Sequence, residues 1–221
     1  MKLFLQAMIK FILGVAIVGA LIFASAGSFE YWNGWLFMGL LFIPMFIAGL
    51  FMMFKNPELL KSRLNGKEKE GEQKKVIALS ALMFAAGFIV AGLNYRFKWM
   101  EIHTSSVVLS SIVFVASYFL YAEVLRENTY LSRTIEVKKD QKVIDTGLYG
   151  IVRHPMYTAT ILLFLSMPLI LGSFISFVIF LIYPVLIAKR IKNEEEVLEK
   201  ELKGYKKYKK NVKYKLIPYI Y

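Results

Sequence analysis

The stretch Trp35–Phe54 reads WLFMGLLFIPMFIAGLFMMF, twenty residues without one charged side chain. A helix needs about 20 apolar residues to cross the hydrocarbon core of a bilayer, so this run has the length of a membrane span. Five other apolar runs flank it: Leu3–Ala26, Val76–Asn94, Ser105–Leu125, and the shorter Pro155–Leu171 and Phe174–Ala188. The pattern predicts an all-α integral membrane protein with five to six transmembrane helices.

The overall composition agrees with this class. The chain has 221 residues, of which 57% are hydrophobic, and this exceeds the roughly 45–50% typical of soluble domains. It has no cysteine, which excludes thiol catalysis, thiolate zinc sites and disulfides. Its two histidines, His103 and His154, are too few for a multi-histidine centre, so we expect no metal.

The basic residues indicate an orientation. With six crossings, 26 of the 28 lysines and arginines fall on one side, and only Arg96 and Lys98 fall on the other. The positive-inside rule assigns the crowded side to the cytosol. We therefore expect a cytoplasmic membrane protein with both termini cytosolic. The net charge of +12 then needs no nucleic-acid partner.

The first apolar run allows a second interpretation. Lys2 and Lys10, an apolar stretch and then Ala24–Ala26 resemble a signal peptide with a small-residue cleavage site. The aromatic residues of Tyr31–Trp35, however, are typical of an interfacial belt that leads into the next span. A retained helix accounts for both features.

The chain divides into two expected regions. Residues 1–126 form a four-helix transmembrane bundle with a cytosolic linker, 55–75, which is either a short interfacial helix or a plain polar loop. Residues 127–221 hold a helical hairpin, 155–188, and a cytosolic tail. In the tail, Lys189–Leu202 has helical spacing and Gly204 is a plausible cap. The lysines and tyrosines that follow fit an anionic lipid surface better than a stacking platform for nucleic acid.

Two polar clusters in the second region are candidates for chemistry. Arg153 and His154 stand where a cytosolic turn meets an apolar helix; alone, they could contact lipid phosphate and cap the turn. Glu194–Glu196 follow several basic residues; alone, they could form a solvated helix face with ion pairs. Together with nearby tyrosines, the two clusters would suit a zwitterionic, partly cationic ligand.

These motifs resemble a known family. In order and spacing, five stretches are similar to the isoprenylcysteine carboxyl methyltransferase family in its broad bacterial branch, which is related to phospholipid N-methyltransferases: Asp145–Tyr149, Val152–Tyr157, Arg190–Glu195, Gly204–Tyr208 and Val212–Pro218. The resemblance covers about Glu127–Pro218.

The resemblance implies a methyltransferase that binds S-adenosyl-L-methionine at the cytosolic membrane face. It implies that the cofactor is bound by Gly147, Tyr149, His154, Tyr157, Glu194 and Glu195. Arg153, Arg190 and Glu195 are implied as catalytic residues, the arginines to orient the cofactor or an anionic acceptor. The partners expected are the bilayer and a lipophilic acceptor with a carboxylate, thiol or amine group.

Two other functions remain open from the sequence. Sterol and steroid reductases that use NADPH have a similar C-terminal pattern with an Arg-His-Pro run, although a 2′-phosphate would require additional basic residues in the pocket. A non-enzymatic scaffold or small transporter is the other alternative. A transporter is expected to place polar groups at mid-bilayer, and the first four apolar runs offer almost none.

Overall fold

The computed structural model describes residues 2–64, 71–131, 137 and 140–221. These ranges contain helices and no strand: α1 (Lys2–Ala26), α2 (Trp32–Lys55), α3 (Pro57–Leu64), α4 (Gly71–Phe97), α5 (Thr104–Glu127), a single 3₁₀ turn (Gly147–Gly150), α6 (Pro155–Ile170), α7 (Phe174–Phe180), α8 (Ile182–Glu201) and α9 (Tyr205–Asn211). By length and composition, α1, α2, α4, α5 and the α7–α8 pair can cross a membrane, and α6 is a shorter apolar helix. The all-α integral membrane class is confirmed.

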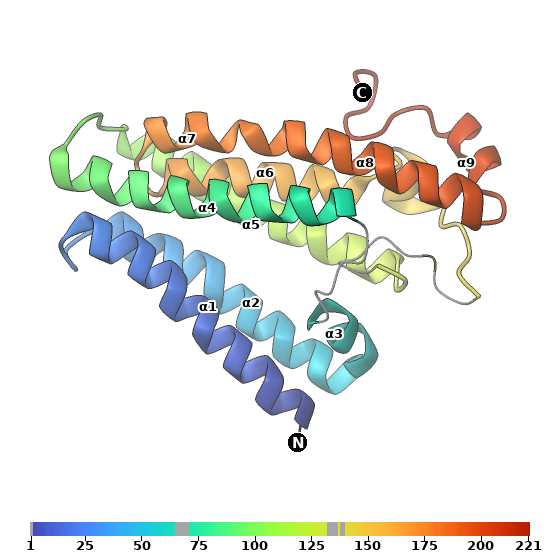
Figure 1. Cartoon of the computed structure of the whole chain (residues 1–221), viewed down its shortest axis with the longest axis horizontal. Helices are drawn as coiled ribbons and strands as arrows, with labels where there is room; N and C mark the ends of the chain where they lie inside the picture. The colour runs from blue at the N-terminus through green and yellow to red at the C-terminus, as the bar shows by residue number, and fades with distance from the viewer. Residues whose placement is uncertain (1, 65–70, 132–136, 138–139) are drawn as a thin grey trace.

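The helices share one hydrophobic core. Helix α5 packs along α6, α1 along α4, and α4 against α7. In Figure 1, α1 and α2 lie at an angle to the remaining long helices, and α3 and α9 lie toward the same end of the bundle. Phe37, Phe114 and Phe180 are fully buried in the common core. The two regions expected from the sequence are therefore packed together.

Large apolar side chains cover the outside of the bundle. Phe51 on α2, Phe119 on α5 and Val185 on α8 are 64%, 73% and 69% exposed. Water would disfavour so much apolar surface, whereas lipid tails match it. The exposed faces therefore agree with a bilayer around the helices.

Of the two interpretations of the linker 55–75, the short helix is found, since Pro57–Leu64 forms α3 and Asn56 Oδ1 accepts a hydrogen bond from the Leu59 amide at 3.0 Å. Residues 65–70 of the linker lie outside the described residues, and residues 71–75 already belong to α4. The second arm of the expected hairpin is longer than 155–188. Helix α8 continues unbroken to Glu201, so the amphipathic stretch is part of the same helix. Gly204 then takes a left-handed φ of +92° and separates α8 from α9.

Polar side chains hold the turn between α6 and α7. The Tyr31 hydroxyl donates to the Leu171 carbonyl, and Asn33 Nδ2 donates to the Ile170 carbonyl at 2.8 Å. Asn94 Nδ2 lies 3.3 Å from the Gly172 carbonyl. These contacts fix the far end of α6 against α2 and α4, and thereby the position of its first turn at the other end.

A close helix contact gives a stability prediction. A Cβ at Gly92 on α4 would lie 2.6 Å from the Ile22 carbonyl of α1, whereas a Cβ at Gly49 would contact nothing within 4 Å. Because overpacking typically costs about 1–3 kcal/mol, Gly92→Ala should lower the thermal midpoint in detergent. Gly49→Ala, the matched control, should leave it unchanged or raise it, since alanine favours helix. Equal midpoints would contradict the close contact between α1 and α4.

Candidate functional site

The site begins at the 3₁₀ turn that follows α5. The Leu148 amide donates to both carboxylate oxygens of Glu127, at 3.2 and 3.0 Å. Gly147 has a φ of +52°, and a Cβ there would lie 1.5 Å from Glu127 Oε1. Asn128 Nδ2 donates to the Tyr149 hydroxyl at 3.1 Å. Gly147 therefore lets the turn close onto α5, which fixes Tyr149.

The start of α6 is held by the chain after α9, residues 212–221, which we call the tail segment. The backbone amides of Arg153 and His154 donate to the carbonyls of Tyr214 and Lys215, both at 2.9 Å. Thr158 Oγ1, on the first turn of α6, donates to the Leu216 carbonyl at 2.8 Å. Residues far apart in sequence thus lie side by side.

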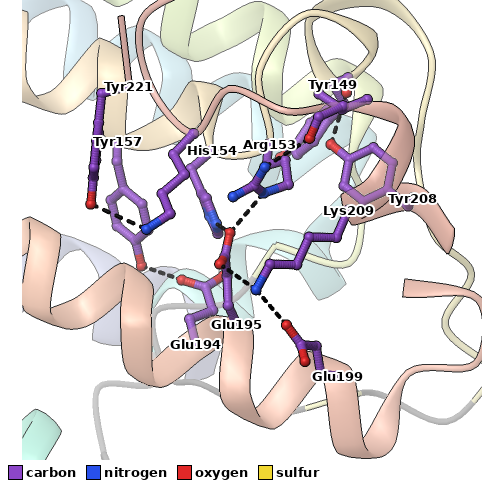
Figure 2. A network of polar contacts seen from close by, with 12 residues as sticks. Tyr149, Arg153, His154, Tyr157, Glu194, Glu195, Glu199, Tyr208, Lys209 and Tyr221 are labelled. Carbon is purple, nitrogen blue, oxygen red and sulfur yellow. Dashed lines mark hydrogen bonds and ion pairs between the residues drawn. The ribbon is translucent and has the colours of Figure 1, made fainter. Parts of the chain in front are cut away.

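A buried carboxylate joins these segments. Glu195 on α8 is 4% exposed, and its Oε1 accepts from Arg153 Nε at 2.7 Å and lies 3.1 Å from His154 Nε2 (Figure 2). Its Oε2 lies 3.1 Å from Lys209 Nζ on α9. Arg153 Nη1 also donates to the carbonyls of residues 212 and 213, at 2.7 Å each. We call Arg153, His154, Glu195 and Lys209 the Glu195 cluster.

A second polar group lies one residue away on α8. The Tyr157 hydroxyl donates to Glu194 Oε2 at 2.6 Å and accepts from Arg190 Nε at 2.9 Å. Arg190 and Glu194 are half-buried, whereas Tyr157 is 4% exposed. The tyrosine thus places a cationic and an anionic side chain next to each other.

Both groups border one polar cavity, whose volume is about 840 Å³ with its open mouth. Its lining includes Asn128, Tyr130, Lys142, Val143, Tyr149, Arg153, His154, Met156, Tyr157, Arg190, Glu194, Leu198, Tyr205 and Tyr208. Aromatic, aliphatic and charged groups of both signs therefore converge on one space.

Tyrosines form the wall of the cavity beside α9. The Tyr208 hydroxyl donates to the Tyr149 carbonyl at 2.8 Å. The Tyr205 hydroxyl is buried and has no hydrogen-bond partner in the described part of the chain. Burial is the largest cause that raises the pKa of Tyr149, Tyr205 and Tyr208, so all three phenols stay protonated near neutral pH. Tyr205 thus offers a hydroxyl to a ligand.

Lys209 is charged in this setting. The carboxylate of Glu199 accepts a hydrogen bond from its ammonium group and, with Glu195, raises the pKa of Lys209 above its usual value.

Within the described ranges, no group of three or more histidine, aspartate or glutamate side chains is arranged to hold a metal ion.

The structure brings most of the expected residues to the cavity. Six of them line it: Tyr149, Arg153, His154, Tyr157, Arg190 and Glu194. Glu195 does not line the cavity and is instead bonded to Arg153. Gly147 does not line it either, and its role is to let the turn approach Glu127. Lys209 has no distinguishing signal in the sequence, because only the return of α9 brings it to Glu195. The expectation that the tyrosines after Gly204 face lipid is wrong for Tyr205 and Tyr208, which are 4% and 5% exposed and line the cavity. Their spacing after Gly204, which puts both on one face of a helix, could have indicated this.

Comparison with known proteins gives two similarities. Residues 94–200, just under half of the chain, match the model of the isoprenylcysteine carboxyl methyltransferase (ICMT) family, so the resemblance seen in the sequence is confirmed over this region. The match begins earlier than the expected residue 127 and ends before the tail segment. The chain is also 30% identical to the mouse Delta(14)-sterol reductase TM7SF2 over 91 residues, which is 40% of this chain and 22% of that protein.

The Glu195 cluster yields a prediction about stability. Glu195→Gln removes the charge that faces buried Arg153, and losing one partner of a buried ion pair costs about 3–5 kcal/mol. We expect a clearly lower thermal midpoint in detergent than for the parent. Glu196→Gln changes the neighbouring, exposed glutamate and should leave the midpoint unchanged. If the two variants unfold at the same temperature, Glu195 does not hold the site together.

Proposed function

We propose that the chain is an S-adenosyl-L-methionine-dependent methyltransferase that acts on a lipophilic acceptor at the cytosolic membrane face. The observation that carries this proposal is the polar cavity itself. In it, the Glu194 carboxylate shares the lining with tyrosine rings and with the Tyr205 hydroxyl, which has no hydrogen-bond partner among the described residues. Most of its walls belong to the region that matches the methyltransferase family.

The lining fits this cofactor by its chemistry. S-adenosyl-L-methionine carries two cations, an ammonium and a sulfonium, together with a carboxylate and an adenosine group. Glu194 would attract a cation, the rings of Tyr149 and Tyr157 would contact the sulfonium or the base, and Tyr205 would donate to a polar atom. When bound, the cofactor supplies an activated methyl group, so the protein mainly contributes position and electrostatics.

The roles of the protein's charged groups follow from their partners. Arg190 is half-buried beside Tyr157, and it would orient an anionic acceptor or the cofactor carboxylate. Arg153 and Glu195 would act as positioning residues, because they bind each other and Arg153 also donates to the tail segment. If the acceptor is an amine, Glu194 is the carboxylate that faces the cavity and could accept its proton.

The acceptor would arrive through the membrane. The cavity lies at the first turn of α6, where an apolar helix begins, and a lipophilic molecule would reach it sideways between helices. A carboxylate or thiolate acceptor needs no general base, since it is already a nucleophile.

A reductase that uses NADPH is the second candidate, because the sterol reductase similarity covers part of the same chain. Such a cofactor brings several phosphates. Among the described residues, the lysines and arginines that line the cavity are Lys142, Arg153 and Arg190, and Arg153 is already paired with Glu195. Lys142 and Arg190 would then have to face several phosphates, which supports the reductase less than the methyltransferase.

Calorimetric titration of the purified protein in detergent distinguishes the candidates. We expect saturable binding of S-adenosylhomocysteine and none of NADPH. Binding of S-adenosyl-L-methionine should weaken about tenfold, or 1.4 kcal/mol, in Glu194→Gln and stay unchanged in Glu196→Gln. Binding of NADPH alone would favour the reductase. Binding of neither ligand by protein that remains folded would favour a non-enzymatic role.

Tyr205 gives a second test with two opposite effects. Tyr205→Phe removes a buried hydroxyl for which the described part of the chain offers no partner, so the ligand-free protein should unfold at an equal or higher temperature. If the hydroxyl binds the cofactor, affinity for S-adenosylhomocysteine should fall by about 1 kcal/mol in the same variant. Tyr208→Phe is the contrast, because it breaks an existing hydrogen bond and should lower stability. Unchanged affinity in Tyr205→Phe would remove this residue from the site.

A further inference from the structure

The tail segment has two different sides. Its inner side holds the start of α6 through the carbonyls of residues 212–216. Its outer side exposes Ile217, Tyr219 and Ile220, by 48%, 87% and 77%. Water disfavours an apolar patch of this kind. We therefore expect these three side chains to contact lipid or another apolar partner.

The position of the tail segment relative to the membrane follows from its contacts. The Leu216 carbonyl accepts from Thr158 on the first turn of α6, and the Lys215 carbonyl from the His154 amide just before it. Helix α6 is apolar and begins at Pro155. The exposed residues of the tail segment therefore lie near the level where the bilayer begins, and not far out in water.

Charge next to this surface is of one sign. Residues 203–221 contain seven lysines and no acidic residue. Lys209 is engaged by Glu195 and Glu199, whereas Lys210 and Lys213 are exposed. Lys215 Nζ lies 4.8 Å from the centre of the Tyr221 ring. Lysines beside tyrosines and isoleucines are the composition of segments that lie in the headgroup region of anionic bilayers.

We infer that the tail segment is an interfacial anchor, which rests in the headgroup region of an anionic leaflet and thereby holds Arg153 and His154 in place. The apolar side chains contact the outer ends of the lipid tails, and Lys210 and Lys213 face lipid phosphates. Lipid contact on the outer side then stabilises the hydrogen bonds on the inner side. This inference stands independently of the reaction that the cavity performs.

Depth measurements test the anchor directly. Since the chain has no cysteine, Ile220→Cys provides a single thiol for a fluorophore in the full-length protein. In liposomes, a headgroup-attached nitroxide lipid should quench this label several-fold more than one on Lys200→Cys, the exposed control near the end of α8. Helical rise places residue 200 about 18 Å beyond the last residue of the apolar run. Equal, weak quenching at both positions would overturn the anchor.

The lipid charge is tested with the same label. Quenching at residue 220 should increase when phosphatidylglycerol is added to phosphatidylcholine liposomes. Lys210→Gln/Lys213→Gln should abolish that increase, and Lys192→Gln/Lys200→Gln, with the same change in net charge, should preserve it. Quenching that is independent of phosphatidylglycerol would overturn the anionic preference.

Hydrogen exchange tests the coupling to α6. In anionic nanodiscs without cofactor, Ile217→Asn/Ile220→Asn should lower the protection of the Arg153 and His154 amides by about tenfold, or 1.4 kcal/mol. Phe29→Asn/Trp99→Asn, which replaces exposed aromatic residues of two other loops, should not change it. Unchanged protection in the tail variant would show that lipid contact does not stabilise the start of α6.

Discussion

The buried carboxylate of Glu195 is the constraint on which the site depends. A carboxylate that is 4% exposed is costly unless cations and donors surround it. Its partners come from the start of α6 and from α9, and Arg153 extends the same network to the tail segment. These segments are far apart in sequence. The cavity therefore has its walls only when they come together around Glu195.

Adjacent glutamates on α8 have different environments. Successive residues on a helix point about 100° apart, so Glu194 and Glu195 face different neighbours. Glu195 points into the buried cluster, whereas Glu194 lines the cavity beside Tyr157 and Arg190. Glu195 therefore holds separate segments of the chain together, whereas Glu194 lines the space that a ligand would occupy. The two arginines differ in the same way: Arg153 is buried and bonded to Glu195 and to the carbonyls of residues 212 and 213, whereas Arg190 is half-buried.

Hydrogen bonds from other parts of the chain hold both ends of α6. Tyr31, Asn33 and Asn94 bind the turn after this helix, and the tail segment binds the residues before it. Helix α5 packs along its length. The first turn of α6 is thus fixed at the boundary between the lipid-covered helices and the polar cavity.

The sequence by itself determined the membrane class, the approximate helix ranges, the family resemblance and six of the residues that line the cavity. It could do so because apolar length and helical spacing are local properties, and because the motif residues Arg153, His154, Tyr157 and Glu194 are read from type and spacing. Tertiary structure alone decided which neighbours Glu194 and Glu195 meet, the pairing of Lys209 with Glu195 and the lack of a partner for the Tyr205 hydroxyl among the described residues. Those features depend on how α9 and the tail segment fold back onto α6, and such long-range contacts leave no periodic signal in the chain.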